Sequence, residues 1–362
     1  MKTLILRNAL QCASLFRLPL TLLTILSFSF ATASAKDPKV LFQSDEMLHI
    51  RIEAPFGELT RKAPNSTDPY TATLILNGEI KEQHAITLSA RGRSRRDRNL
   101  CTFPPLRVAF NEKPNEPSLF HKQKRLKLVT HCKKSSAYQQ YYLLEYTAYK
   151  LLNIMTPISL RVRMAEIDYV EAGSGKTIAT RIGFFIEDTD DAAKRNDMKE
   201  IDLPDIDMPQ LNTQAAARYA LFQYMIGNLD WSMHNGPEDR DCCHNTKLVG
   251  AAKDSTSGLI PVPYDFDYSG LVNAPYAVPP TEIRIQTVRT RRYRGFCAHN
   301  AEALSEARLI KANRQAFHDV IEDVPALSDN KKRKTHKYLD KFFDATENDK
   351  IMEKRVLAAC RD

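Results

Sequence analysis

Polar side chains that could bind a metal ion and move a proton gather between residues 226 and 267. Asp230 comes just after an apolar helical segment, for which Gly227 is an available terminator. Asn245 stands directly before one short strand-like segment, and Asp265 and Asp267 stand at the end of the next. In phosphoryl transfer, one Asp orients the acceptor and takes its proton, while an Asn and a second Asp hold magnesium on the nucleotide phosphates. This order of residue types therefore indicates phosphoryl transfer, and hard oxygen ligands favour Mg²⁺ or Mn²⁺ over zinc.

The same residues also have a plainer, structural interpretation. Asp265 and Asp267 could cap a turn, because Asp side chains bond readily to nearby backbone N–H groups. Gly227 and Asn228 could form only a helix stop. These residues alone leave both interpretations open.

Several segments resemble the signature segments of the CotH-type spore-coat kinases and, more distantly, of the HipA-type kinases. They are Gly-Asn-Leu-Asp-Trp at 227–231, Pro-Tyr-Asp-Phe-Asp at 263–267, Arg-Gly-Arg-Ser-Arg at 91–95, Leu-Arg-Val-Ala-Phe at 106–110 and Ile-Gly-Phe-Phe-Ile-Glu-Asp at 182–188. Their order and rough spacing hold over residues 85–270, which is more specific than any single segment. These families are atypical members of the protein-kinase-like fold, so the resemblance implies that fold here.

The resemblance implies a role for each residue of the polar group. Asp230 becomes the catalytic aspartate, and Asp265, with Asp267 beside it, becomes the metal-binding carboxylate. Two asparagines match the metal-binding amide. Asn235 follows Asp230 by five residues, whereas Asn245 directly precedes a strand, as the family's His-Asn segment does. We favour Asn245, with two adjacent cysteines in an insertion before it.

The resemblance also implies ATP and Mg²⁺ (or Mn²⁺) as cofactors. The positions that it assigns to the nucleotide are Arg91, Arg95, Arg107, Lys127, Glu145 and Glu187. Glu187, or Glu145 on the preceding helix, would support the cation that binds the nucleotide. Arg107 stands where the family carries a phosphate-binding lysine, with Lys127 in the next basic strand as a substitute. A guanidinium fork does not reproduce the point charge of a lysine, so this departure indicates altered nucleotide use or lost activity.

The elements that must position these residues change in character near residue 200. Before it, alternating apolar residues predict strands at 47–54, 71–76, 84–89, 106–110, 125–130, 160–170 and 178–186, with one helix at 135–152. Turns are expected at Asn77-Gly78 and at 172–175, since Gly-Ser-Gly-Lys-Thr at 173–177 lacks the first glycine of a phosphate-binding loop. After residue 200, a helix is expected at 213–226, short strands at 246–251 and 259–263, and further helices over 301–359.

From these elements and the resemblance we expect an α+β protein with an atypical protein-kinase-like, two-lobed fold. A strand-rich lobe would span residues 36–200, and a mainly helical lobe with the catalytic and metal-binding loops would span residues 201–362. The nucleotide would lie in the cleft between the two lobes.

The N-terminal segment 1–35 has the features of a cleavable export signal. Lys2 and Arg7 give a positive start, and a largely apolar stretch follows over 15–30. Ala33 and Ala35 supply the small side chains that a signal peptidase accepts, so cleavage is expected after Ala35. The alternative is a retained anchor, but the apolar run is short for a spanning helix, which needs about 20 residues. We therefore expect a periplasmic or secreted protein without a transmembrane anchor.

Cysteine usage agrees with export. Removing the signal leaves an even set that could form up to three disulfides in an oxidising compartment, comprising Cys101, Cys132, Cys242, Cys243, Cys297 and Cys360. Adjacent cysteines rarely bond to each other, so Cys242 and Cys243 are expected to reach different partners. A zinc site with Cys132, Cys242, Cys243 and His244 is the less favoured alternative.

The net charge of the chain is mildly positive, and the excess cations gather in a few segments. Cations gather at 91–98, 122–134 and 284–294, within an overall net charge of +8. Such clusters are solvated surface or indicate an acidic partner or an anionic envelope surface. Nucleic-acid binding is not expected, because no known module interleaves aromatic residues with these cations.

The favoured function is therefore Mg²⁺-dependent phosphoryl transfer from ATP to a protein hydroxyl, with a protein substrate in the envelope or outside the cell. Transfer of AMP is a related alternative. An inactive kinase-like binding module of the cell envelope is the alternative from another class, favoured by Arg107 at the lysine position.

Overall fold

Alternating apolar residues build a closed barrel in the first half of the chain. The computed structural model describes residues 36–78, 81–237 and 241–362, and residues 36–362 belong to one compact unit. The barrel strands are β1 (Leu48–Ala54), β2 (Tyr70–Leu76), β3 (Glu82–Ala90), β4 (Leu106–Phe110), β5 (Arg125–Val129), β6 (Val162–Glu171) and β7 (Lys176–Ile186). They pair in the order β1-β2-β3-β4-β5-β7-β6, and β6 closes the ring by pairing parallel to β1. Every second side chain, such as Ile50, Ile52 and Leu74, is buried in a barrel core.

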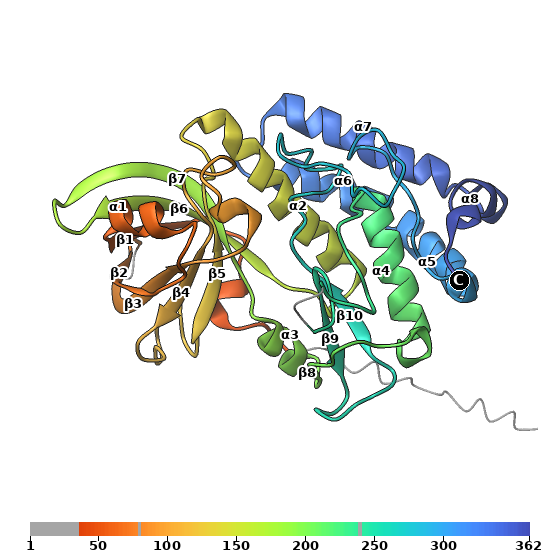
Figure 1. Cartoon of the computed structure of the whole chain (residues 1–362), viewed down its shortest axis with the longest axis horizontal. Helices are drawn as coiled ribbons and strands as arrows, with labels where there is room; N and C mark the ends of the chain where they lie inside the picture. The colour runs from red at the N-terminus through yellow and green to blue at the C-terminus, as the bar shows by residue number, and fades with distance from the viewer. Residues whose placement is uncertain (1–35, 79–80, 238–240) are drawn as a thin grey trace, which may run out of the picture. The chain divides into compact units, whose positions relative to one another are not determined.

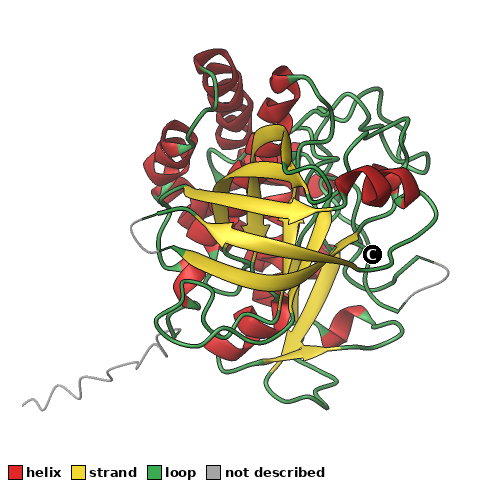
Figure 2. Cartoon of the chain, turned by 90° about the vertical axis from the view of Figure 1, so that its left-hand side faces the viewer, coloured by secondary structure: helices red, strands yellow, loops and turns green. Residues whose placement is uncertain are grey.

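The second half of the chain is mostly helical around a small sheet. Its helices are α4 (Thr213–Ile226), α5 (Asn300–Ala312), α6 (Arg314–Asp323), α7 (Asp329–Ala345) and α8 (Asp349–Arg355). The sheet is antiparallel in the order β10-β9-β8, with β8 (Lys199–Ile201), β9 (Thr246–Gly250) and β10 (Ile260–Pro263). Figure 1 shows this half beside the barrel, and Figure 2 looks onto the barrel strands.

Helix α2 (Gln139–Met155) joins the two halves. It follows barrel strand β5 in the chain, but its buried residues, such as Leu143 and Leu151, share a core with Phe222, Phe266 and Leu339 of the second half. Two shorter helices complete the fold. Helix α1 (Phe56–Lys62) lies between β1 and β2 in the chain, and α3 (Thr189–Arg195) follows β7, the last barrel strand.

The expected elements are confirmed, and the mixed α+β class with them. All of the expected strands are present, and the helix expected at 213–226 has those bounds as α4. The segment 172–175 is the turn between β6 and β7. Helices α1 and α3 and strand β8 were not expected, because they are too short to show a period. Closure of the barrel was not expected either, because it depends on pairing between distant strands.

The cysteines of the described residues are paired as Cys101–Cys132, Cys242–Cys243 and Cys297–Cys360, which is consistent with an oxidising location. The expectation that Cys242 and Cys243 would reach different partners is wrong, since the two are bonded to each other. The zinc alternative is not assembled either, because Cys132 is bonded to Cys101. The expected signal peptide and its cleavage point lie outside the described residues. Within the described ranges no helix is long and apolar enough to span a membrane.

Candidate active site

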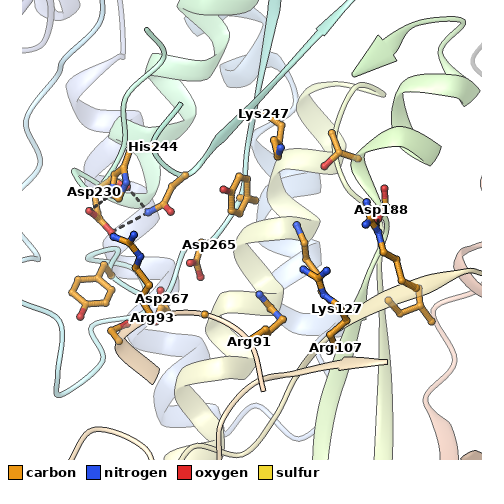
Figure 3. Close-up of a pocket in the computed structure, with 18 of the residues that line it drawn as sticks. Arg91, Arg93, Arg107, Lys127, Asp188, Asp230, His244, Lys247, Asp265 and Asp267 are labelled. Atoms are coloured by element: carbon orange, nitrogen blue, oxygen red, sulfur yellow. Dashed lines mark hydrogen bonds and ion pairs between the residues drawn. The ribbon is translucent and has the colours of Figure 1, made fainter. Parts of the chain in front are cut away.

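A cavity of about 660 Å³ brings together side chains from the barrel and the helical half. It is lined by Arg91, Gly92, Arg93, Ser94, Arg107, Arg125, Leu126, Lys127, Asp188, Thr189, Glu200, Asp230, His244, Asn245, Lys247, Tyr264, Asp265, Asp267 and Tyr268. Figure 3 shows Asp230 and His244 at one end and Asp188 at the other. The expected catalytic and metal-binding residues Asp230, Asn245, Asp265 and Asp267 all line this one cavity.

Asp230 is held by contacts on each of its carboxylate oxygens. Helix α4 ends at Gly227, which has φ +64°, and the side chain of Asn228 then accepts a hydrogen bond from the Asp230 N–H at 3.1 Å. His244 Nε2 lies 2.7 Å from Asp230 Oδ1, and Asn245 Nδ2 donates to Oδ2 at 2.9 Å. Asn245 Nδ2 also donates to the backbone oxygen of Asp230 at 2.8 Å. The carboxylate therefore has a fixed orientation in the cavity.

The hairpin of β9 and β10 explains why Asn245 and Asp265 meet. Thr246, the first residue of β9, pairs with Pro263, the last residue of β10. The next pair along is Asn245 and Tyr264, whose backbone N–H donates to the Asn245 oxygen at 3.1 Å. Asn245 and Asp265 both have positive φ, of 50° and 65°, a conformation that is uncommon for residues other than glycine and that clusters at functional sites.

Arg95 is the centre of a buried ion-pair network behind the cavity. Its Nη1 lies 3.2 Å from Glu145 Oε2, its Nη2 lies 3.1 Å from Asp265 Oδ1 and its Nε lies 3.4 Å from Asp267 Oδ2. Burial lowers the pKa of Arg95, but the carboxylates of Asp267 and Glu145 outweigh it and raise that pKa well above its ordinary value. Burial raises the pKa of Asp267 to about 8, against the lowering effect of Arg95. The network ties the Arg-Gly-Arg turn to α2 and to the loop after β10.

The barrel contributes a cationic wall. Arg107 on β4 and Lys127 on β5 are cross-strand partners, so their side chains lie on the same face and both reach the cavity. The Lys127 ammonium lies 4.8 Å from the centre of the Tyr264 ring. Burial and then the charge of Arg91 lower the pKa of Lys127 to about 8. Arg91 Nε is buried without a hydrogen-bond partner among the described residues.

The structure does not bring every expected residue to the cavity. Glu187 is buried and paired with Arg195 at 3.1 Å, where it fixes α3 against the end of the barrel. Asn235 lies in a bridge with Asp205 and accepts from the Ser232 hydroxyl, away from the lining. Glu145 lies behind the cavity and reaches it only through Arg95.

Some lining residues were not predicted from the sequence to take part in phosphoryl transfer. They include Arg93, Asp188, His244, Lys247 and Tyr268. A signal existed for two of them. His244 adjoins Asn245 in the His-Asn segment. Lys247 follows Asn245 by two positions, which places Asn245 and Lys247 on one side of an extended segment.

The side-chain oxygens of Asn245 and Asp265 fit a magnesium ion that is also ligated by a phosphate. Asn245 uses its amide nitrogen on Asp230, which leaves Oδ1 as the atom that can ligate. The Asp265 side chain is 38% exposed, whereas that of Asp267 is 6% exposed and accepts from Tyr276 at 2.8 Å. In the described parts of the chain, no group of three or more His, Cys, Asp or Glu side chains could hold a metal. Two protein oxygens completed by phosphate and water are the usual surroundings of Mg²⁺ in phosphoryl transfer.

In comparisons with known proteins, no family model matches this chain and no curated protein matches it. One of the solved structures that resemble it is the crystal structure of CtkA, a proinflammatory kinase from Helicobacter pylori. That likeness covers 69% of this chain and 92% of the other chain, with 11% identity and a TM-score of 0.38. Because the similarity is low, a function for this chain depends on the residues of the cavity.

Proposed function

We propose that this chain is an exported, kinase-like phosphotransferase that moves a phosphoryl group, in the presence of Mg²⁺ or Mn²⁺, from ATP to a hydroxyl of a protein. The observation that carries the proposal is the convergence of Asp230, Asn245 and Asp265 on one cavity. These are the residues that the family resemblance selects, and they come from three separate loops of the helical half.

Asp230 is the residue that would orient the acceptor hydroxyl and take its proton. The acceptor oxygen forms a bond to the γ-phosphorus, the bond from that phosphorus to the bridging oxygen breaks, and ADP leaves with the bridging oxygen. His244 and Asn245 hold the two Asp230 oxygens in place, so the carboxylate needs little reorientation as the proton arrives.

Asn245 and Asp265 would hold the metal ion, which supplies neutralisation of the phosphate charge when bound. Arg91 and Lys127 would contact the phosphates from the barrel side, because both line the cavity as cations. Arg95 acts indirectly, since it pairs with Asp265, Asp267 and Glu145 rather than facing the cavity.

Export is supported by the features of residues 1–35 and by the paired cysteines. The acceptor is then a protein of the envelope or of the surroundings of the cell, and the cationic clusters favour an acidic one.

A second candidate is a kinase-like binding module without catalysis. Active protein kinases pair a strand lysine with a helix glutamate, but here Glu145 pairs with Arg95 and Lys127 lies over Tyr264. The closed barrel is also not the usual strand-rich lobe of a protein kinase.

Thermal-shift titration of the full chain with ATP and Mg²⁺ or Mn²⁺, followed by a transfer assay with labelled ATP, tests the proposal. We expect a metal-dependent rise in Tm that Asp265→Asn removes. Asp230→Asn should keep that rise and lose transfer. Asp254→Asn, an exposed residue at the far end of the same hairpin, is the matched control and should behave as the wild type.

Each alternative outcome has a distinct meaning. No shift with either metal would remove the support for nucleotide binding. Binding without transfer in the wild type would establish the inactive module. Retained transfer in Asp230→Asn would show that another group takes the proton.

A further inference from the structure

We propose that the end of the cavity away from Asp230 binds a row of phosphate groups rather than a purine base, so that the site takes linear oligophosphates as a class and holds ATP through its triphosphate alone. This inference rests on the proposed phosphoryl transfer and names its donor class. We call this end the far half, and define it by Arg107, Arg125, Lys127, Asp188, Glu200 and Lys247.

The far half lacks the surface that a purine needs. A flat, largely apolar base is bound in proteins mainly between apolar and aromatic side chains. Among the described lining residues, Leu126 is the sole aliphatic side chain, and it is 2% exposed and belongs to the barrel core. The walls of the far half are instead charged on both sides.

The aromatic ring nearest to the far half is already covered by a cation. Tyr264 lines the cavity, but the Lys127 ammonium lies over its ring at 4.8 Å. A base stacking on that face would displace a buried ammonium from a favourable cation–π contact.

The cations of the far half outnumber its acids. Lys247 pairs with Glu200 at 2.8 Å, and Arg125 pairs with Asp188 at 3.2 Å. Within the described residues Arg107 and Lys127 have no ion pair with an acid, and Arg91 Nε next to them is buried without a partner. Uncompensated cations at a cavity wall are costly unless an anion meets them.

These cations lie in a row that starts near the catalytic end. Figure 3 shows Arg91, Lys127 and Arg107 between Asp265 and Asp188, on the barrel side of the cavity. A chain of phosphates whose terminal group lies at Asp265 and Asp230 would meet these cations one after another. Charge-assisted hydrogen bonds to phosphate are the strongest that such side chains form.

The chemical step keeps its balance with this donor. The acceptor oxygen forms a bond to the terminal phosphorus, and the bond from that phosphorus to the bridging oxygen breaks. The chain, shorter by one phosphate, leaves with the bridging oxygen, and the acceptor's proton passes to Asp230.

Isothermal titration calorimetry of the full chain with Mg²⁺ separates the two kinds of donor. We expect tripolyphosphate to bind, a longer linear polyphosphate to bind more tightly, ATP to bind no more tightly than tripolyphosphate, and adenosine not to bind. Arg107→Gln should weaken binding of the longer chain roughly tenfold. Lys176→Gln, an exposed cation at the other end of the barrel, is the control and should leave it unchanged.

ATP binding more than tenfold tighter than tripolyphosphate, or measurable binding of adenosine, would overturn the inference in favour of a purine site. Tighter binding of inositol hexakisphosphate than of a linear hexaphosphate would overturn the linear chain in favour of a compact polyphosphorylated ligand. These binding orders do not depend on turnover. Absence of transfer from every donor would contradict the proposed function and leave the binding inference to be judged separately.

Discussion

Arg95 and Glu145 form an ion pair of 3.2 Å that joins the turn after β3 to helix α2. Both side chains are buried, and the same guanidinium also reaches Asp265 and Asp267. One guanidinium therefore contacts three carboxyl groups at the junction of the barrel and the helical half. This junction determines where the candidate metal-binding carboxylate lies.

Replacing Arg95 should destabilise the protein strongly. In Arg95→Met the side chains of Glu145 and Asp267 would stay buried without their cation, a change that costs about 3–5 kcal/mol for a broken buried pair. Arg95→Lys keeps the charge but loses the planar guanidinium fork, so its free energy of unfolding should lie between those of the wild type and Arg95→Met. Urea unfolding at neutral pH measures the free energy of unfolding for each variant.

The control for this prediction is Arg98→Met, an exposed arginine of the same turn, which should change stability by less than about 0.5 kcal/mol. In addition, Glu145→Gln in the Arg95→Met background should recover part of the loss, because it removes one of the unpaired charges. Equal stability of Arg95→Met and Arg98→Met would contradict the network.

His244 should affect turnover more than binding of the donor. It holds Asp230 Oδ1 at 2.7 Å, so His244→Ala would remove this contact and keep the one that Asn245 makes with Oδ2. We expect kcat to fall roughly tenfold or more with little change in KM for the donor. His244→Gln, which keeps a donor near the position of Nε2, should retain more activity, and exposed His49→Ala should match the wild type. A rise in KM with unchanged kcat would show that His244 binds the donor instead.

Gly227 should tolerate no larger side chain. It has φ +64°, and an added Cβ would lie 2.0 Å from the hydroxyl of buried Tyr338. Gly227→Ala should lose about 2–4 kcal/mol, from the left-handed backbone and from overpacking. Gly258 has φ +65° with open space around it, so Gly258→Ala should lose only about 1–2 kcal/mol from the backbone. Thermal and urea unfolding compare the two, and equal losses would exclude the clash.

The spacing of apolar residues predicted the strands and long helices because each of these elements has one buried face. The alternation at 47–54 and the spacing in 213–226 are local properties of the sequence, and the structure has β1 and α4 there. Barrel closure is not local, because it requires β6 to lie parallel to β1 across most of the first half. The motifs likewise selected Asp230 and Asp265, whose loops the structure brings to one cavity.

Contacts between distant charges could not be predicted in the same way. The Arg-Gly-Arg turn drew attention to Arg95 as a nucleotide-binding cation, yet its contacts are with carboxylates of α2 and of the loop after β10. The run of cations in segment 284–294 indicates solvated surface or a partner-binding surface. In the structure Arg294 donates to the backbone oxygen of Leu229 at 2.6 Å, and Arg291 to that of Met225 at 2.9 Å, so both support the loop that carries Asp230. Which partner a cation meets depends on the tertiary fold.

The disulfide Cys101–Cys132 should stabilise both the fold and the cationic turn. It joins cysteines 31 positions apart and closes the segment that follows Arg95. Next to the disulfide, the Thr102 N–H donates to the backbone oxygen of Cys132 at 2.9 Å. Cys101→Ala with Cys132→Ala should lose about 3–4 kcal/mol by loss of chain constraint. Removing Cys297–Cys360 in the same way should cost a similar amount but leave oligophosphate or ATP binding intact, because that pair joins the segment before α5 to residue 360 and neither cysteine lines the cavity. Equal effects of the two pairs on binding would contradict a local role for Cys101–Cys132.

His131 should make stability depend on pH. Its ring stacks on Phe103 at 4.2 Å and meets Tyr169 at 4.9 Å, and burial followed by the charge of Arg181 lowers its pKa from 6.5 to about 4. The unfolded chain therefore takes up this proton at a higher pH than the folded chain, so stability falls as the pH falls from about 6.5 to about 4. The loss from this group is on the order of 3 kcal/mol.

The comparison that isolates this effect is between the wild type and His131→Phe, which can keep the stacking on Phe103 but cannot be protonated. Urea unfolding at several pH values between 7 and 4 should show the wild type losing stability relative to His131→Phe throughout that window. His49→Ala, at an exposed position, should follow the wild-type curve. Plots of unfolding free energy against pH that run parallel for the wild type and His131→Phe would contradict the prediction. A buried imidazole that resists protonation must make the wild-type free energy fall faster as the pH falls.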